Sequence, residues 1–488
     1  MAASKRPPLL TAFQILLLLS GWAVAVAFGL RHWNTPRHLP VAPPVQAAPE
    51  IVTAPPPEGK FERIFREWTE DPKVAGALIG FCLLDEDGGT VFASPLATSA
   101  LCPASALKTV TTGAAFGLLG PDFRFETTLA GTGPLDAAGN LEGDLVLVGG
   151  GDPTFSLDDL AALADAAIAS GLKAVKGRVR VDASVFPHDP TNEQWNWGDI
   201  GNAYGAGAFG LNLNHNRMEV HFGAGAQPGD PVKIHASGPV ARDTRWENHV
   251  VTAAPGGGDE VVIYSEPYGR RITLRGSVPA DVPDFPIYGA IPDPPALAAE
   301  TLRAHLEAAG IKFGDAPGPF TQSEPTTLAH HPSAPLAEII DHLHKVSDNL
   351  EAQCLFITIG LRQNTAPAEA VRQYWEKAGV SFAGLRLLDG SGLARANMIR
   401  PIDLARVNLA ARRGPHGQRF FESLTKYADG AAHGKIGGMS GVKTQVGFVQ
   451  TAAGRDLTFA LMANGLPVDR SFWTRLDALL KTVRDTEH

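Results

Sequence analysis

A serine followed three residues later by a lysine can act as a nucleophile with its base, and this chain of 488 residues contains three such pairs. A serine hydroxyl is a weak nucleophile that needs an adjacent base, and a lysine whose charged form is disfavoured by burial can be that base. The pairs are Ser105/Lys108, Ser170/Lys173 and Ser423/Lys426. Because the spacing occurs three times, at least two pairs are expected to be coincidental, and the elements around each pair must decide between them.

The stretch PASALKTVTTGAAFGLLG predicts a helix that places Ser105 in its first turn, with Pro103 before the start and Gly120 after the end. Positions three apart share a helix face, so the Lys108 amine is expected beside the Ser105 hydroxyl. The helix N-terminus would add a partial positive charge and free N–H groups where an oxyanion develops. The pair at Ser170 instead straddles the end of a helix, and the third pair lies late in the chain with no companion motifs after it.

Two companion motifs follow Ser105 in the chain. The tripeptide Ser-Asp-Asn at 347–349 interrupts two apolar-periodic helices, and such a boundary can point side chains into a cleft. The tripeptide Lys-Ile-Gly at 435–437 begins an alternating run that is followed by a turn and a second apolar run. This pattern predicts a strand at a sheet edge and a hairpin.

The order Ser-x-x-Lys, Ser-x-Asn, Lys-x-Gly, on helix, inter-helix loop and strand, resembles the signature of serine penicillin-recognising enzymes. Five blocks narrow the resemblance to the D-alanyl-D-alanine carboxypeptidase/endopeptidase family of the penicillin-binding protein 4 type, over roughly residues 60–485. The blocks are GDLVLVGGGDPTF, GLNLNHN, KVSDNLEAQ, LDGSGLARANMI and GKIGGMSGVKTQVGF. The resemblance implies an α+β fold in which helices flank an antiparallel sheet, with inserted, mainly β domains.

The resemblance also implies catalytic roles. Ser105 would attack the carbonyl between two D-alanines of a peptidoglycan stem peptide and become acylated. Lys108 would take its proton, and Ser347 would relay a proton to the leaving amine. Water would then release the peptide, with no metal and no other cofactor. β-Lactams would acylate the same serine as covalent inhibitors.

For substrate binding, the resemblance implies that Asn349 holds the substrate amide and that Lys435 places positive charge beside the substrate carboxylate. The backbone N–H groups of Ser105 and Gly438 would form the oxyanion hole, where one donor contributes about 2.7–4 kcal/mol. We place Gly437, the last residue of the Lys-x-Gly motif, with these substrate-binding residues.

Two positions depart from the family pattern. Ile436 stands where the family has a hydroxyl-bearing Thr or Ser that contacts the substrate carboxylate, and Gly438 stands where the family often has Ser or Thr. Loss of a charge-assisted hydrogen bond predicts roughly a tenfold to hundredfold lower kcat/KM. Ser440 or Thr444 are candidates to compensate. Two interpretations therefore stay open. The first is an active peptidase whose endopeptidase cleavage is less affected than its carboxypeptidase cleavage. The second is a non-catalytic relative that binds cell-wall peptides or partner proteins.

The N-terminus predicts export. Lys5 and Arg6 precede an apolar run, so residues 1–31 are expected to be a cleaved signal peptide or a membrane anchor, and the protein to act outside the cytoplasm. A Pro/Ala-rich spacer is expected over 32–58. The peptidase domain is expected at 59–123 and 286–488, with inserted domains at 124–285 as in relatives, and the helix within 286–311 is expected to return the chain to the peptidase domain.

Other features exclude function classes. The net charge of −9 argues against a nucleic-acid partner. The three cysteines form no zinc spacing, allow at most one disulfide and are expected to be buried. Neither His342 and His344 nor the histidines at 330–331 have a ligand partner at a recognised motif spacing, so no metal site is expected. Trp195 and Trp197 are expected in core or interface packing, and the oligomeric state is left open.

Overall fold

The computed structural model describes residues 59–74, 76–314, 326–467 and 472–486. The chain divides between Glu58 and Gly59, and the described residues belong to the second unit, Gly59–His488. The predicted export segment and the Pro/Ala-rich spacer therefore lie outside the described residues. Within the described ranges, no helix combines the length and apolar character that crossing a membrane requires.

A six-stranded antiparallel sheet supports the candidate site. In spatial order its strands are β16 (Thr425–Tyr427), β17 (Ala432–Met439), β18 (Val442–Gln450), β19 (Asp456–Asn464), β1 (Leu78–Leu84) and β2 (Thr90–Ala93). Strand β1 is buried at every position after its first residue, because helices cover both faces of the sheet. The strand and hairpin predicted from residue 435 onward are β17, β18 and β19.

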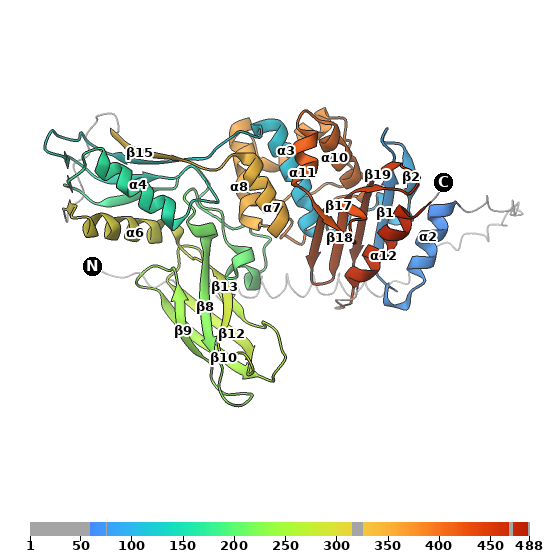
Figure 1. The fold of residues 1–488 in the computed structure, drawn as a ribbon, viewed down its shortest axis with the longest axis horizontal. Coiled ribbons are helices and arrows are strands. Elements are labelled where there is room, and N and C mark those ends of the chain that lie inside the picture. The colour runs from blue at the N-terminus through green and yellow to red at the C-terminus, as the bar shows by residue number, and fades with distance from the viewer. Residues whose placement is uncertain (1–58, 75, 315–325, 468–471, 487–488) are drawn as a thin grey trace, which may run out of the picture. The chain divides into compact units, whose positions relative to one another are not determined.

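Two helices cover one face of this sheet, α2 (Lys60–Thr69) and α12 (Phe472–Arg484) (Figure 1). The apolar face predicted for the first helix is confirmed, because Phe61, Ile64, Phe65 and Trp68 pack against the core between α2, α12 and the sheet. The other face is covered by α3 (Lys108–Leu119), α7 (Leu336–Val346), α8 (Asn349–Gln363), α9 (Pro367–Lys377), α10 (Pro401–Arg413) and α11 (Gly417–Ser423). Short 3-10 turns η1 (Pro72–Val74), η2 (Pro95–Thr98) and η3 (Ala104–Leu107) connect these elements.

Between α3 and α7 the chain builds a second set of mainly β structure around its own apolar core. One sheet has the order β15 (Thr326–Pro332), β3 (Glu126–Gly131), β5 (Leu145–Val148), β7 (Val179–Asp182), and a short one the order β14 (Lys312–Phe313), β6 (Ala174–Val175), β4 (Asn140–Leu141). There are two further three-stranded sheets. The first has the order β13 (Phe285–Ala290), β8 (Arg217–Gly223), β9 (Lys233–Gly238). The second has the order β10 (Arg245–Ala253), β12 (Arg271–Pro279), β11 (Val262–Tyr264). The helical pieces are α4 (Leu157–Ala169), α5 (Trp197–Ile200), η4 (Ala203–Gly205), η5 (Asn214–Asn216) and α6 (Pro294–Ala308). The predicted α+β class with inserted β structure is confirmed.

The expectation that the helix within 286–311 returns the chain to the peptidase domain is wrong. This helix, α6, packs against α4 and β7, and Leu302 and Leu306 join the core of the inserted strands. The following strand β15 also pairs with β3. A hydrophobic stripe predicts a helix, but it does not say which of two cores will cover the stripe. The domain boundaries drawn from the sequence remain predictions, and we propose that the insert extends to Pro332.

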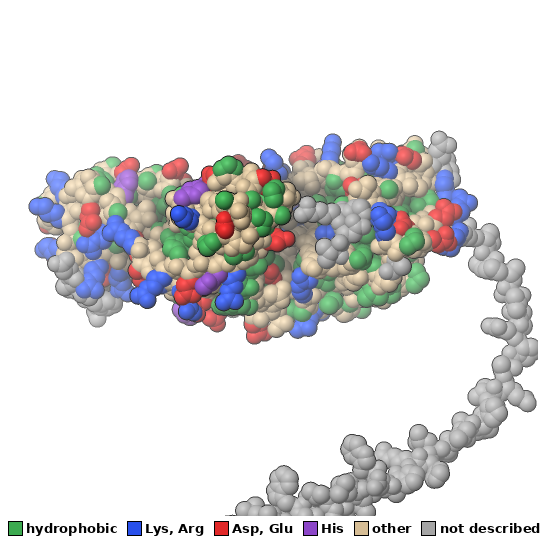
Figure 2. Space-filling model, turned by 90° about the horizontal axis from the view of Figure 1, so that it is seen from below, with side chains coloured by type: hydrophobic (Ala, Val, Ile, Leu, Met, Phe, Trp, Pro, Cys, Tyr) green, Lys and Arg blue, Asp and Glu red, His purple; other side chains and the backbone are tan. Residues whose placement is uncertain are grey.

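The face of the molecule seen in Figure 2 carries acidic and basic side chains interspersed over most of the described surface. Mixed charge of this kind lacks the extended basic stripe that neutralises a phosphate backbone.

Candidate active site

The first motif lies where η3 passes into α3. Ser105 is in the 3-10 turn and partly exposed, whereas Lys108 begins the α-helix and is completely buried. The sequence predicted one continuous helix, and the tighter first turn still leaves the two side chains on one face. Lys108 Nζ lies 3.0 Å from Ser105 Oγ.

The Lys108 amine has two further partners, Asn349 Oδ1 at 2.5 Å and the backbone oxygen of Ser391 at 2.9 Å. A neutral amine has two N–H donors and one lone pair. When the amine is neutral, the two carbonyl oxygens, which can only accept, take its two N–H groups and its lone pair is left for Ser105 Oγ; when it is protonated, its third N–H donates to Ser105 Oγ. The geometry therefore suits a neutral lysine that accepts the serine proton.

The electrostatics of Lys108 agree with that geometry. Burial and, to a smaller extent, the nearby Lys435 ammonium lower its pKa to about 7 against the opposing effect of the Asp389, Asp348 and Glu351 carboxylates. Desolvation is the dominant cause because removing an ammonium from water is costly. About half of the molecules then hold a neutral Lys108 amine at pH 7.

The loop that supplies the Ser391 carbonyl is held by Asp389. Its carboxylate is fully buried and accepts from the backbone N–H groups of Ser391 at 3.0 Å, Gly392 at 2.6 Å and Ala394 at 2.7 Å. The indole N–H of Trp195, from the inserted segment, donates to the same carboxylate at 2.7 Å. Trp195 is buried in this interface, so the packing predicted for it is confirmed, whereas Trp197 is 58% exposed and the same prediction is wrong for it.

Gly392 shows how closely the loop approaches the nucleophile. A Cβ at this position would lie 2.0 Å from the backbone oxygen of Ala104, the residue before Ser105. Only glycine permits this approach, and its positive φ of 86° fits glycine as well.

The second motif lies at the break between α7 and α8, as predicted. Ser347 adopts a left-handed conformation with φ of 63° at the end of α7, and Asp348 caps the start of α8 by accepting from Glu351 N at 2.9 Å. Asn349 is the first residue of α8, and its Nδ2 donates to Tyr204 O at 2.7 Å. Asn349 thus connects the base Lys108 to the inserted segment.

The third motif is joined to the second by a direct contact. Lys435 Nζ donates to Ser347 Oγ at 2.9 Å and to Ile436 O at 2.8 Å. Burial lowers the pKa of Lys435 to about 8. A cation of this kind polarises the Ser347 hydroxyl and favours proton transfer through it.

Strand β17 offers a free edge beside the nucleophile. Within the described residues β16 pairs only with positions 432–434 of β17, which leaves the backbone from Lys435 to Met439 open on that side. A Cβ at Gly437 would lie 2.6 Å from Ala106 N and 2.8 Å from Ser105 N, so glycine allows the strand to approach the N–H groups at the nucleophile. An extended peptide can therefore pair with β17 while its carbonyl reaches Ser105.

The two departures from the family pattern lie on the opposite face of β17 from Lys435. Ile436 is 40% exposed, and a Cβ at Gly438 would meet Trp473 at 3.0 Å and Lys443 Nζ at 3.3 Å. Thr444 is completely buried, so its hydroxyl does not reach the exposed face of β17.

The other Ser-x-x-Lys pairs do not lie on one helix. Ser170 caps the end of α4 and donates to Ala167 O, and Ser423 ends α11 while Lys426 lies on β16. His344 is buried between two hydroxyl groups, and burial lowers its pKa to about 3, as expected for a core histidine. The three cysteines are free and buried, as predicted.

Sequence reasoning missed Asp389, the Ser391 carbonyl and Tyr204. The block LDGSGLARANMI contributed to the resemblance, but nothing in its pattern says that its backbone contacts a lysine 283 residues earlier. The bend around Asp389 was the available signal, since an Asp that accepts from several following N–H groups is typical of such turns.

The sequence and the fold of this chain are similar to those of known proteins. The model of the D-Ala-D-Ala carboxypeptidase 3 (S13) family matches residues 63–478. A D-alanyl-D-alanine carboxypeptidase from an Actinomadura species is 31% identical over 435 residues, which cover 81% of this chain and 79% of that relative. D-alanyl-D-alanine carboxypeptidase DacB from Haemophilus influenzae is 26% identical over 415 residues, which cover 80% of this chain and 86% of that relative. The solved structure of penicillin binding protein 4 from H. influenzae shares the fold with a TM-score of 0.75 at 23% identity, over 86% of this chain and 97% of that one.

Proposed function

The chain belongs to the D-Ala-D-Ala carboxypeptidase 3 (S13) family, and from this membership we propose that it cleaves the bond between two D-alanines in peptidoglycan stem peptides. It is a serine carboxypeptidase by family, and we assign the nucleophile to Ser105 and the base to Lys108. One observation carries the assignment: the completely buried Lys108 Nζ lies 3.0 Å from Ser105 Oγ, and Asn349 Oδ1 and Ser391 O hold it there.

The acylation step follows from these contacts. Lys108 accepts the hydroxyl proton as Ser105 Oγ bonds to the carbonyl carbon of the penultimate D-alanine. The resulting oxyanion accepts from the N–H groups of Ser105 and Gly438. As the C–N bond breaks, the leaving amine takes a proton relayed from Lys108 through the Ser347 hydroxyl, which Lys435 contacts.

Deacylation reverses the proton path. Water loses a proton to the Lys108 amine as its oxygen attacks the ester carbon. The Ser105 oxygen leaves and takes that proton back, which restores the free site. Asn349 and the open edge of β17 hold the peptide in place during both steps.

Recognition of the terminal carboxylate is where this chain differs from the family pattern. Ile436 supplies no hydroxyl, whereas Lys443 lies opposite Gly438 and provides positive charge on the same face of β17. We propose that cross-linked peptides, which are cut by endopeptidase action and carry no free D-Ala carboxylate at this place, suffer less from Ile436 than pentapeptides do.

Two further properties follow from the proposal. A β-lactam complex of the H. influenzae penicillin binding protein 4 has been solved, and we propose that β-lactams acylate Ser105 in this chain. Because peptidoglycan lies outside the cytoplasmic membrane, we also propose an extracytoplasmic site of action. Whether residues 1–31 are cleaved or retained as an anchor remains a separate prediction.

The non-catalytic alternative is not favoured, because family and relatives are peptidases and the nucleophile contacts its base. The test is to incubate the purified chain with a pentapeptide stem and with a cross-linked dimer and to weigh the products by mass spectrometry. Loss of one D-alanine, or conversion of dimer to monomers, is expected for the wild type and for Ser170→Ala, the serine of a coincidental pair. Both products should be absent with Ser105→Ala. A Ser105→Ala variant that still forms them, or an inactive wild type, would overturn the proposal.

A further inference from the structure

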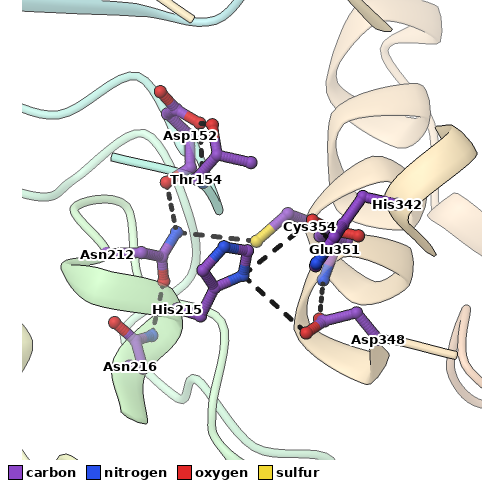
Figure 3. A network of polar contacts seen from close by, with 9 residues as sticks. All are labelled: Asp152, Thr154, Asn212, His215, Asn216, His342, Asp348, Glu351 and Cys354. Atoms are coloured by element: carbon purple, nitrogen blue, oxygen red, sulfur yellow. Dashed lines mark hydrogen bonds and ion pairs between the residues drawn. The ribbon is translucent and has the colours of Figure 1, made fainter. Parts of the chain in front are cut away.

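Three potential metal ligands meet beside the Ser347–Asn349 loop, from three separate elements. His215 belongs to η5, His342 to α7 and Glu351 to α8. Their candidate ligand atoms all lie within 4.8 Å of one another. Figure 3 shows the His215 ring, on the inserted segment, directed at Glu351 and at Asp348 across the interface.

The distances suit a small ion. Glu351 Oε1 lies 2.8 Å from His342 Nδ1 and 3.9 Å from His215 Nδ1. Imidazole and carboxylate ligands at about 2.0–2.1 Å from a tetrahedral zinc ion lie about 3.3 Å from each other. The observed separations lie on either side of this value, so side-chain rotations that move the ligand atoms by a few tenths of an ångström bring them into position. Asp348 Oδ2, at 3.7 Å from His215 Nδ1, is close enough to supply a fourth oxygen.

Unsatisfied polar atoms point into the same place. Glu351 is completely buried, and its Oε2 has no hydrogen-bond partner among the described residues. The Nδ1 atom of His215 is also buried without one. A buried polar atom without a partner is costly, and such atoms in a native fold call for a ligand, an ion or a solvent molecule.

The backbone around His215 is held in an unusual conformation. Asn214, His215 and Asn216 have φ values of 56°, 53° and 49°, three successive left-handed residues that are not glycine. Asn216 fixes this turn, because its Oδ1 accepts from Leu213 N at 2.9 Å and its Nδ2 donates to Gly207 O at 2.9 Å. Strain of this kind persists only where surrounding contacts impose it, and it concentrates at functional sites.

The charges also favour a cation. Asp348 and Glu351 bring two carboxylates to one side of the interface, and Glu351 lies in the first turn of α8, where the helix dipole favours its anionic form. A divalent cation would supply the counter-charge for these two carboxylates.

We propose that His215, His342 and Glu351 bind one divalent cation of the zinc class, with Asp348 or a water as the fourth ligand. Mixed imidazole and carboxylate ligands suit zinc, whereas calcium and magnesium prefer oxygen alone. The ion connects the inserted segment to both helices that flank Ser347 and Asn349. It therefore stabilises the loop that carries two of the proposed active-site residues, and it takes no part in the chemistry.

A second cluster in the chain provides the matched control. His221, His235 and Asp284 also meet, but Asp284 is exposed and is hydrogen bonded to both rings at 2.9 and 3.0 Å. These contacts satisfy the exposed cluster without an ion. Removing one of its histidines changes the histidine content in the same way without touching the proposed site.

The test starts from purified full-length chain stripped with a chelator. Zinc affinity is measured by competition with a chromophoric chelator, and the melting temperature is measured with and without zinc. We expect one equivalent bound with a micromolar or lower Kd and a higher melting temperature. In His215→Gln and in His342→Gln, Kd should rise roughly 100-fold or more and the zinc-induced rise in melting temperature should disappear, whereas His235→Gln should behave as wild type.

The melting temperature without zinc shows whether each variant is folded. If one of the two histidine variants does not fold, the other still tests the proposal. The proposal is overturned if the stripped wild type binds no zinc when the zinc concentration is 100 times the protein concentration. It is equally overturned if a folded His215→Gln or His342→Gln binds as tightly as wild type, or if His235→Gln alone abolishes binding. Peptidase activity is not a readout, so failure of this proposal leaves the assignment of Ser105 untouched.

Discussion

The acylation rate should follow the protonation state of Lys108. The base works only as the neutral amine, and burial together with the Lys435 ammonium lowers its pKa to about 7. With the usual lysine pKa of about 10.4, roughly 1 amine in 2,500 would be neutral at pH 7, whereas a pKa of about 7 leaves about half neutral. Burial and the Lys435 ammonium thus raise the population of active base by about three orders of magnitude, the equivalent of about 4 kcal/mol.

The magnitude of the pH effect follows directly. Below the pKa the neutral fraction falls tenfold per pH unit, so the rate at pH 6 should be about one fifth, and at pH 5 about one fiftieth, of the rate at pH 7. Above pH 8 the rate should fall again, because Lys435, whose pKa is lowered to about 8, loses the charge that polarises Ser347. The profile should be a bell with its maximum between these two values.

The assay is the second-order rate of labelling by a fluorescent penicillin from pH 5 to 10, with circular dichroism at each pH as a check on folding. A rate that stays flat between pH 5 and 7 in folded protein would refute the assignment of Lys108 as the base. So would an acid limb with its midpoint near the usual lysine value.

A variant isolates the electrostatic cause. Lys435→Gln removes the ammonium that lowers the pKa of Lys108, so the midpoint of the acid limb should move to higher pH even though the absolute rate falls. Lys426→Gln, which removes an exposed lysine from the adjacent strand β16, should leave the midpoint unchanged. Equal shifts in both variants would mean that general surface charge sets the profile.

Three substitutions test other parts of the account. Ile436→Thr restores the hydroxyl of the family pattern and should raise kcat/KM for a pentapeptide roughly tenfold to hundredfold, with a smaller gain for a cross-linked dimer. Mass spectrometry of the products measures both rates. An unchanged kcat/KM would show that this hydroxyl is not limiting. Gly437→Ala places a Cβ 2.6 Å from Ala106 N and should slow penicillin labelling roughly 100-fold, and wild-type labelling in a folded variant would contradict the close approach of β17. Trp195→Phe removes an indole donor from the buried Asp389 carboxylate and should lower the free energy of unfolding by about 1.5–3 kcal/mol in urea titrations; no loss would argue against this contact.

Local pattern predicted much of the candidate site. Ser105 and Lys108 are three residues apart, so the helix geometry alone brings their side chains together, and the 3-10 start of the helix does not alter that result. The same is true of the break that holds Ser347 and Asn349, because capping and periodicity are encoded by neighbouring residues. The contact of Lys435 with Ser347 could be expected only through resemblance to a family.

Contacts between distant segments could not be read from the chain. Helix α6 has a clear apolar stripe, yet the choice between two cores depends on the shape of strands that the pattern does not describe. Trp195 reaches Asp389 across 194 residues, and His215 meets Glu351 across an interface that no motif spacing marks. Such pairs are set by how domains pack, and periodicity carries no information about that packing.

The central claim is that Ser105 carries the acyl group, and intact-protein mass spectrometry after incubation with penicillin tests it most directly. We expect one covalent adduct per chain, located by proteolysis on the peptide that contains Ser105 and absent from Ser105→Ala. An adduct that persists in Ser105→Ala, or a folded wild-type chain that takes up no penicillin, would contradict it.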